Sequence, residues 1–108
     1  MKWMETIKVQ AAIGQEKSVE MALQDLAHAA ANHPDCSGFL NATVYRHAVV
    51  PGYLAIHLFW DTEQAQIRGS VWGLNLIEIL KAMGLVDHAV WIQNSKEEGD
   101  QKNANWKS

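Results

Sequence analysis

The sequence contains few of the residues that cross-link or interrupt small domains. Its 108 residues include one cysteine, two prolines and seven glycines. Because Cys36 is the single cysteine, no disulfide can form within the chain, which favours a reducing compartment. The first residues form no apolar run of signal-peptide length, and no stretch approaches the roughly 20 apolar residues of a membrane span. We therefore expect a soluble, cytoplasmic protein that does not act at a membrane.

An excess of positive charge is also missing. Lys and Arg number 9 against 12 Asp and Glu, which gives a net charge of −3. Without a basic stripe, nucleic acid is not an expected partner. No glycine-rich phosphate loop occurs, so no nucleotide cofactor is indicated. His47, His57 and His88 fall on different predicted strands without a paired-ligand motif, so no metal site is predicted.

Large apolar side chains are well represented. The chain has five tryptophans and is 48% hydrophobic, enough to build one core and to leave flat aromatic surface for an interface or a ligand. After residue 94 the composition changes to a polar stretch without hydrophobic periodicity. We therefore predict one domain over residues 1–94 and a loose polar tail over residues 95–108.

The hydrophobic pattern changes period along the chain in a regular order. Alternation predicts strands at 3–12, 39–48, 53–60 and 85–93, whereas three- and four-residue steps predict helices at 15–33 and 71–83 and a short helical piece at 62–68. Ser70 is the predicted N-cap of the later helix, with Leu74, Ile77 and Leu80 on its buried side. The order β-α-β-β-α-β predicts an α+β, ferredoxin-like fold with a four-stranded antiparallel sheet and two helices on one face.

Two helices can cover one face of such a sheet. The other face would then expose aromatic side chains, among them Tyr45, Tyr53 and Phe59. An exposed aromatic surface of this kind is typical of an interface. We therefore expect a homodimer in which two sheet faces enclose a barrel-like space.

The stretch "GYLAIHLFWD", residues 52–61, places one histidine in an apolar strand. Alternation puts an all-apolar set on the side that meets the helices: Leu54, Ile56, Leu58 and Trp60. His57 then faces the open side. Asn41, Thr43 and Tyr45 of the preceding strand are expected on the same side, which makes a lining that is partly polar and partly aromatic, as in ligand sites.

The stretches "HPDCSGFLNATVYR" and "YLAIHLFWDTEQA", with this element order, resemble the dimeric α/β-barrel superfamily and within it the antibiotic biosynthesis monooxygenases. The resemblance covers about residues 3–93. It implies cofactor-free oxygenation of aromatic polyketides or quinols, as in some members, haem degradation as in others, or plain ligand binding. The haem-degrading relatives use an Asn on the first strand and a Trp and a His after the third. Here Trp72 is present, but the Asn and the His are not.

The resemblance and the pattern together give a candidate site for a small aromatic or quinone-like ligand. His57 would be the base that takes a proton from a phenol or enol, since the ordinary pKa of histidine is near 6.5. Asn41 and Thr43 would orient oxygen atoms, and Tyr45 with Trp72 would supply apolar walls. No cofactor is expected.

Each of these assignments has a simpler alternative. In the simpler interpretation, His57 is a hydrogen-bonded histidine of a dimer interface, the polar residues are ordinary surface residues, and Trp72 is a core residue. The chain would then be a non-catalytic small-molecule-binding or stress-related dimer. A third reading is an isomerase or decarboxylase on the same fold, which needs no oxygen. Cys36 has no obvious base beside it and is not expected to be a nucleophile.

Overall fold

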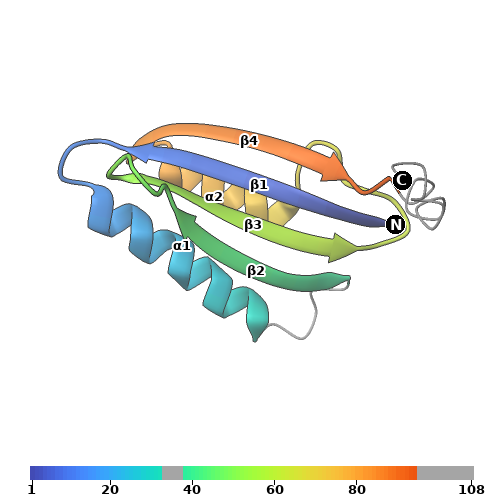
Figure 1. The fold of residues 1–108 in the computed structure, drawn as a ribbon. Helices are drawn as coiled ribbons and strands as arrows, with labels where there is room; N and C mark the ends of the chain where they lie inside the picture. Colours follow the sequence, from blue (N-terminus) through green and yellow to red (C-terminus); the bar gives the residue numbers. More distant parts are fainter. Residues whose placement is uncertain (33–37, 95–108) are drawn as a thin grey trace.

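The computed structural model describes residues 1–32 and 38–94. Cys36 and the predicted polar tail lie outside the described residues. Four strands and two helices follow one another in the predicted order (Figure 1): β1 (Lys2–Ala11), α1 (Glu16–Ala31), β2 (Phe39–Arg46), β3 (Tyr53–Asp61), α2 (Val71–Leu80) and β4 (Gly84–Ile92).

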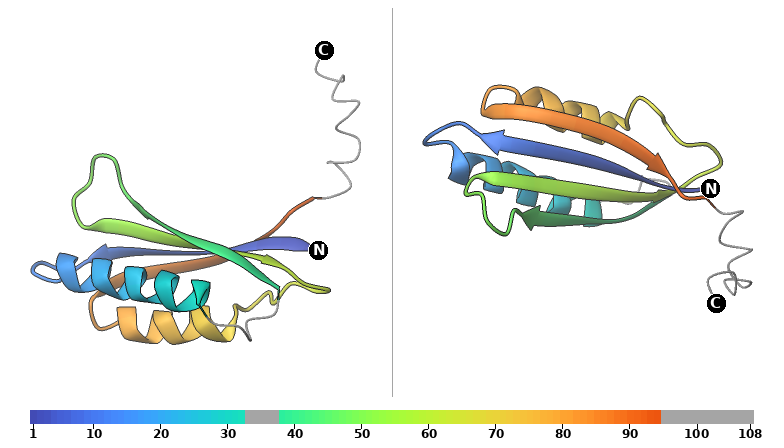
Figure 2. Two further views of the ribbon diagram at one scale, coloured as in Figure 1. Left: turned by 90° about the horizontal axis from the view of Figure 1, so that it is seen from below. Right: turned by 45° about the horizontal axis from the view of Figure 1, so that its top comes forward.

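The strands form one antiparallel sheet in the order β2-β3-β1-β4. Both helices pack on the same face of that sheet, as the left view of Figure 2 shows. This confirms the ferredoxin-like α+β fold. No helix in the described ranges is long and apolar enough to span a membrane.

The core lies between the sheet and the helices and is built from the inward-facing residues of β1 and β3. As alternation predicts, Ile56, Leu58 and Trp60 are buried there, opposite Ile7 and Trp3 of β1. From the helices, the fully buried members of this core are Val19, Leu23 and Leu80.

Helix α2 begins at the predicted cap. The Ser70 hydroxyl accepts a hydrogen bond from the Gly73 N–H at 3.0 Å. This start sets the phase of the helix, so that Gly73, Leu76 and Leu80 face inward. Leu74, predicted on the buried side, is instead 43% exposed.

The predicted helical piece at 62–68 is wrong. These residues form bends and a turn that is closed by a Gly69 N–H to Gln66 carbonyl bond of 2.8 Å. Asp61 does not cap a helix, because it is the last residue of β3 and its carboxylate pairs with the chain's amino terminus at 3.2 Å. The Thr62 hydroxyl accepts from the Trp3 indole N–H and donates to the Gln64 carbonyl.

The sheet face opposite the helices carries no other element of the described chain. We call it the open face. Trp91 and Tyr45 are 59% and 46% exposed on it, and Leu85 is 77% exposed. The register places Met4, Thr6 and other side chains from all four strands on this face, and it is there that the predicted site lies.

Candidate functional site

His57 occupies the middle of the open face. The register pairs it with Thr6 of β1 and with Thr43 of β2. The centre of its ring lies 4.7 Å from that of Tyr45 and 6.2 Å from that of Phe59. The imidazole is therefore half-buried between two aromatic rings, with hydroxyl-bearing residues on either side.

The surroundings of His57 favour its neutral form. Partial burial lowers the pKa of the imidazole below its ordinary value of 6.5, and the positive charge of Lys8 lowers it further. A neutral imidazole can accept a proton at pH 7, which a histidine held as imidazolium cannot.

The polar residues predicted beside His57 are on its face of the sheet. Asn41 pairs with Phe59, Thr43 with His57, and Tyr45 with Ala55. Phe39, which simple alternation places with them, is not on this face. An irregularity between Phe39 and Asn41 shifts the register, so that Phe39 pairs with Trp60 and contacts its ring edge-on at 5.4 Å.

Trp72 is not near the other predicted residues in the folded chain. It lies in the first turn of α2, on the face that the helices cover, half-buried and with its ring 6.0 Å from that of Phe39. The sheet therefore separates Trp72 from His57 and Tyr45. Together with Trp3, which stacks on Trp60 at 5.3 Å, these rings form an aromatic cluster behind the sheet.

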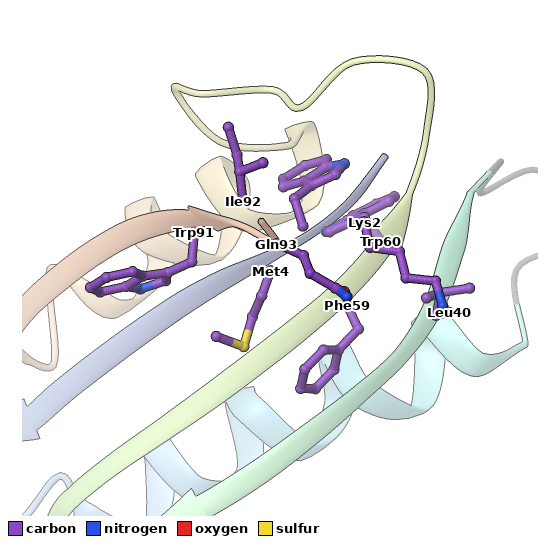
Figure 3. Close-up of a pocket in the computed structure, with 9 residues that line it drawn as sticks. Lys2, Met4, Leu40, Phe59, Trp60, Trp91, Ile92 and Gln93 are labelled. Atoms are coloured by element: carbon purple, nitrogen blue, oxygen red, sulfur yellow. The ribbon is translucent and has the colours of Figure 1, made fainter. Parts of the chain in front are cut away.

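Two hollows lie on either side of His57 along β3. The larger, of about 360 Å³, we call the Lys8 hollow; it is lined by Lys8, Tyr45, Arg46, His47, Tyr53, Leu54 and Ala55. The smaller, of about 260 Å³, is mostly apolar and is lined by Lys2, Trp3, Met4, Leu40, Phe59, Trp60, Trp91, Ile92 and Gln93. In Figure 3, Met4 and Phe59 project from neighbouring strands to the same side of the sheet. Each hollow is of the size of a small ligand site or slightly below it.

A second polar cluster, which we call the Glu5 cluster, lies on the helix-covered face. The carboxylate of Glu5 is fully buried. It accepts hydrogen bonds from the Ser70 hydroxyl at 2.7 Å, from the Ser70 N–H at 3.0 Å and from His88 Nε2 at 2.9 Å. Gly73 and Gly69 pack against it so closely that a Cβ at either position would overlap the Glu5 carboxylate or the His88 ring.

The Glu5 cluster joins three parts of the chain. It ties β1 and β4 to the start of α2 through the hydrogen bonds of Glu5 to His88 and Ser70. Ser70 is engaged twice, as donor to Glu5 and as helix cap, so its hydroxyl is not free to act as a nucleophile. We therefore interpret this cluster as the anchor of α2 on the sheet.

Glu5 was not predicted as a site residue, and His88 was named only among the histidines without a metal-ligand motif. A signal for each was present, because Glu5 interrupts the apolar inward row of Trp3 and Ile7, and His88 interrupts that of β4. Within the ranges 1–32 and 38–94, no three His, Cys, Asp or Glu side chains converge to hold a metal ion.

Comparison by sequence finds no match: no family model fits the chain, and no curated protein matches it. Solved structures do match. One is a variant of SnoaB from Streptomyces nogalater, described as a cofactor-independent oxygenase, with 17% identity, a TM-score of 0.65 and coverage of 86% of this chain and 93% of that chain.

Two further structures extend this comparison. A proposed antibiotic biosynthesis monooxygenase from Deinococcus radiodurans has 17% identity and a TM-score of 0.67, with coverage of 85% of this chain and 92% of that chain. A conserved protein from Methanosarcina mazei has 14% identity and a TM-score of 0.67, with coverage of 87% and 94%. The chain thus has the fold of proteins named as antibiotic biosynthesis monooxygenases, which confirms the resemblance at the level of the fold.

Proposed function

We propose that this protein is a cofactor-independent monooxygenase that acts on a small aromatic or quinol-type substrate. The observation that carries the proposal is the setting of His57, a half-buried imidazole between aromatic rings, whose pKa is lowered and which lies between two hollows that its neighbours line. The shared fold with SnoaB, a protein described as a cofactor-independent oxygenase, supports it.

The chemistry needs a base and an electron-rich substrate, with dioxygen as oxidant. His57 takes a proton from a phenol or from an activated ring carbon, which leaves a delocalised anion. The anion passes one electron to dioxygen, and the two radicals combine into a peroxide at a ring carbon that still carries a hydrogen. The peroxide takes back the proton held by His57. The hydroperoxide then loses water, whose second hydrogen comes from the same carbon, and the remaining oxygen atom stays on that carbon as a carbonyl group. The substrate supplies all the electrons, so no reductant is required.

The neighbours of His57 position the ligand in this proposal. Asn41 and Thr43 donate hydrogen bonds to substrate oxygens, where negative charge develops as the proton leaves. Tyr45, whose ring already lies against the imidazole, supplies an apolar wall. Trp72 is not given a place in this wall, because the sheet lies between it and His57.

The site is open to solvent in a single chain, so the proposal includes a second copy. The open face exposes Tyr45 and Trp91, and neither helix of the described ranges 1–32 and 38–94 lies on it. A homodimer formed through this face would exclude water from both hollows and enclose the substrate. Native mass spectrometry tests this step: a dimer is expected, and a monomer at micromolar concentration would remove the enclosure from the mechanism.

Two alternatives differ from the oxygenase because neither consumes dioxygen. The rings stacked on the open face, such as His47 on Tyr53 at 5.4 Å, would also suit a non-catalytic binding or stress-related dimer. An isomerase or decarboxylase would use the same proton transfer to His57 without consuming dioxygen.

Oxygen uptake distinguishes these functions. The purified protein is offered a panel of hydroquinones and anthrones in a closed oxygen electrode. Uptake above the buffer rate is expected for at least one of them. His57→Phe should abolish it while the far-ultraviolet circular dichroism stays unchanged, and His28→Phe, a change at an exposed helix residue, should retain it. Full activity of His57→Phe would remove His57 from the mechanism.

A further inference from the structure

We propose that the Lys8 hollow binds a planar aromatic anion, with the negative group against Lys8 and the ring against Tyr45 and Tyr53. The proposal that the hollow binds such an anion is supported by the geometry of the hollow. Its assignment as the substrate site rests on the function proposed above, because Tyr45, which lines the hollow, also packs against His57. The ligand class is a hydroxyaromatic carboxylate or phenolate.

The walls of the Lys8 hollow are aromatic and approach it from two strands. Tyr53 begins β3, and its ring stacks on that of His47 with an angle of 12° between the planes. Tyr45 lies on β2, and its ring contacts that of His57. The volume of about 360 Å³ suits a ligand of one or two fused rings. Flat side chains on a rigid sheet are suited to bind another flat ring.

The positive charges of the hollow have no negative partner in the described part of the chain. Lys8 and Arg46 both line it, and neither forms an ion pair there. The acidic residues nearest in the fold do not change this. Asp87 lies opposite Lys8 in the register, and Glu16 and Glu20 share a separate hollow with Arg46, yet none of them forms an ion pair with either cation.

The position of Lys8 relative to His57 explains why an anion fits. Proton transfer to His57 would place an imidazolium near the ammonium group of Lys8, and two like charges repel. A bound anion would reduce this repulsion by interacting favourably with both positive groups. The anion formed when the substrate gives its proton to His57 would thus be stabilised by the same lysine that otherwise disfavours the transfer.

The test compares an acid with its neutral analogue. Hydroxynaphthoate and the corresponding hydroxynaphthamide have the same ring system, and the amide lacks the charge. Isothermal titration of the full-length protein should show the acid binding about tenfold more tightly than the amide, since one partly exposed charge pair contributes roughly that factor. Raising the salt concentration should weaken binding of the acid and leave the affinity for the amide unchanged.

Three lysine variants locate the charge. Lys8→Met should remove the preference for the acid, and Lys8→Arg should restore most of it. Lys2→Met is the matched control, because Lys2 lies on the same strand and lines the other hollow. Equal affinity for acid and amide, or the same loss in the Lys2 and Lys8 variants, would overturn the proposal.

The remaining outcomes separate this inference from the proposed function. If Lys8→Met dissociates the dimer without changing the affinity for the acid, the lysine pairs with the partner subunit and the inference fails. Selective binding of the acid without oxygen uptake from any substrate supports the site and refutes the oxygenase. Oxygen uptake from neutral substrates, without any preference for acids, supports the oxygenase and refutes the site.

Discussion

Loss of the Glu5 carboxylate should destabilise the protein more than any exposed substitution. Its three hydrogen bonds come from donors that belong to Ser70 and His88. Replacing Glu5 by Ala would leave those donors without an acceptor, in a place that excludes water. Each buried donor left without an acceptor costs about 1–3 kcal/mol, so the loss of an acceptor shared by three donors should cost about 3–5 kcal/mol. A domain of this size has a total stability of about 5–15 kcal/mol.

Urea unfolding followed by circular dichroism measures this loss. With an m-value of about 1–3 kcal/mol per molar urea, the midpoint of Glu5→Ala should fall by about 1 M or more. Glu5→Gln keeps the shape and one acceptor oxygen, so its loss should be about 1–2 kcal/mol. Glu20→Ala, on the exposed side of α1, should change the free energy of unfolding by no more than about 0.5 kcal/mol.

A double-mutant cycle assigns the loss to the contact itself. If Glu5 and His88 interact as the structure has it, the two Ala substitutions should be non-additive by at least about 0.5 kcal/mol. Equal stability of Glu5→Ala and Glu20→Ala would refute the reasoning, since it would mean that the carboxylate is neither buried nor bonded. Additive effects of the Glu5 and His88 substitutions would refute the contact between these two residues but not the burial of the Glu5 carboxylate.

Two further predictions concern the packing of α2 and the acid limb of activity. Gly73→Ala would push a methyl group into the Glu5 carboxylate and should cost about 1–3 kcal/mol, seen as a lower melting temperature, whereas Leu74→Ala on the exposed side should cost less. Because the pKa of His57 is lowered, kcat/KM should fall only as the pH drops below 6.5, through that lowered pKa. Lys8→Met removes one of the two causes and should move this acid limb to higher pH; an unmoved limb would show that His57 is not the titrating base.

Hydrophobic alternation was sufficient to predict which face of the sheet each site residue occupies. It placed His57, Thr43 and Tyr45 together, and the structure agrees. It failed where the backbone departs from a regular period. The register shift before Asn41 turns Phe39 to the helix side, which no count of every second residue predicts.

The remaining errors have a different physical origin. Of the predicted inward row of α2, Leu80 is buried and Ile77 packs against the core, but Leu74 is exposed, because the first turn of the helix buries Gly73 against Glu5. The Glu5 cluster joins residues that are 65 and 83 positions apart in the chain, so no local pattern shows that they meet. Burial of a carboxylate can be suspected from an apolar row, but its partners become known only when the strands and α2 are placed together.

The most direct test of the central claim follows the oxygen atoms. The substrate with the fastest uptake is turned over under isotopically heavy dioxygen by protein that has been checked by mass spectrometry and absorption to carry no metal or flavin. A monooxygenase places one heavy oxygen atom in the product and the other in water, and His57→Phe should abolish both. A product free of heavy oxygen, formed at the same rate without air, would contradict the monooxygenase and favour an isomerase or decarboxylase.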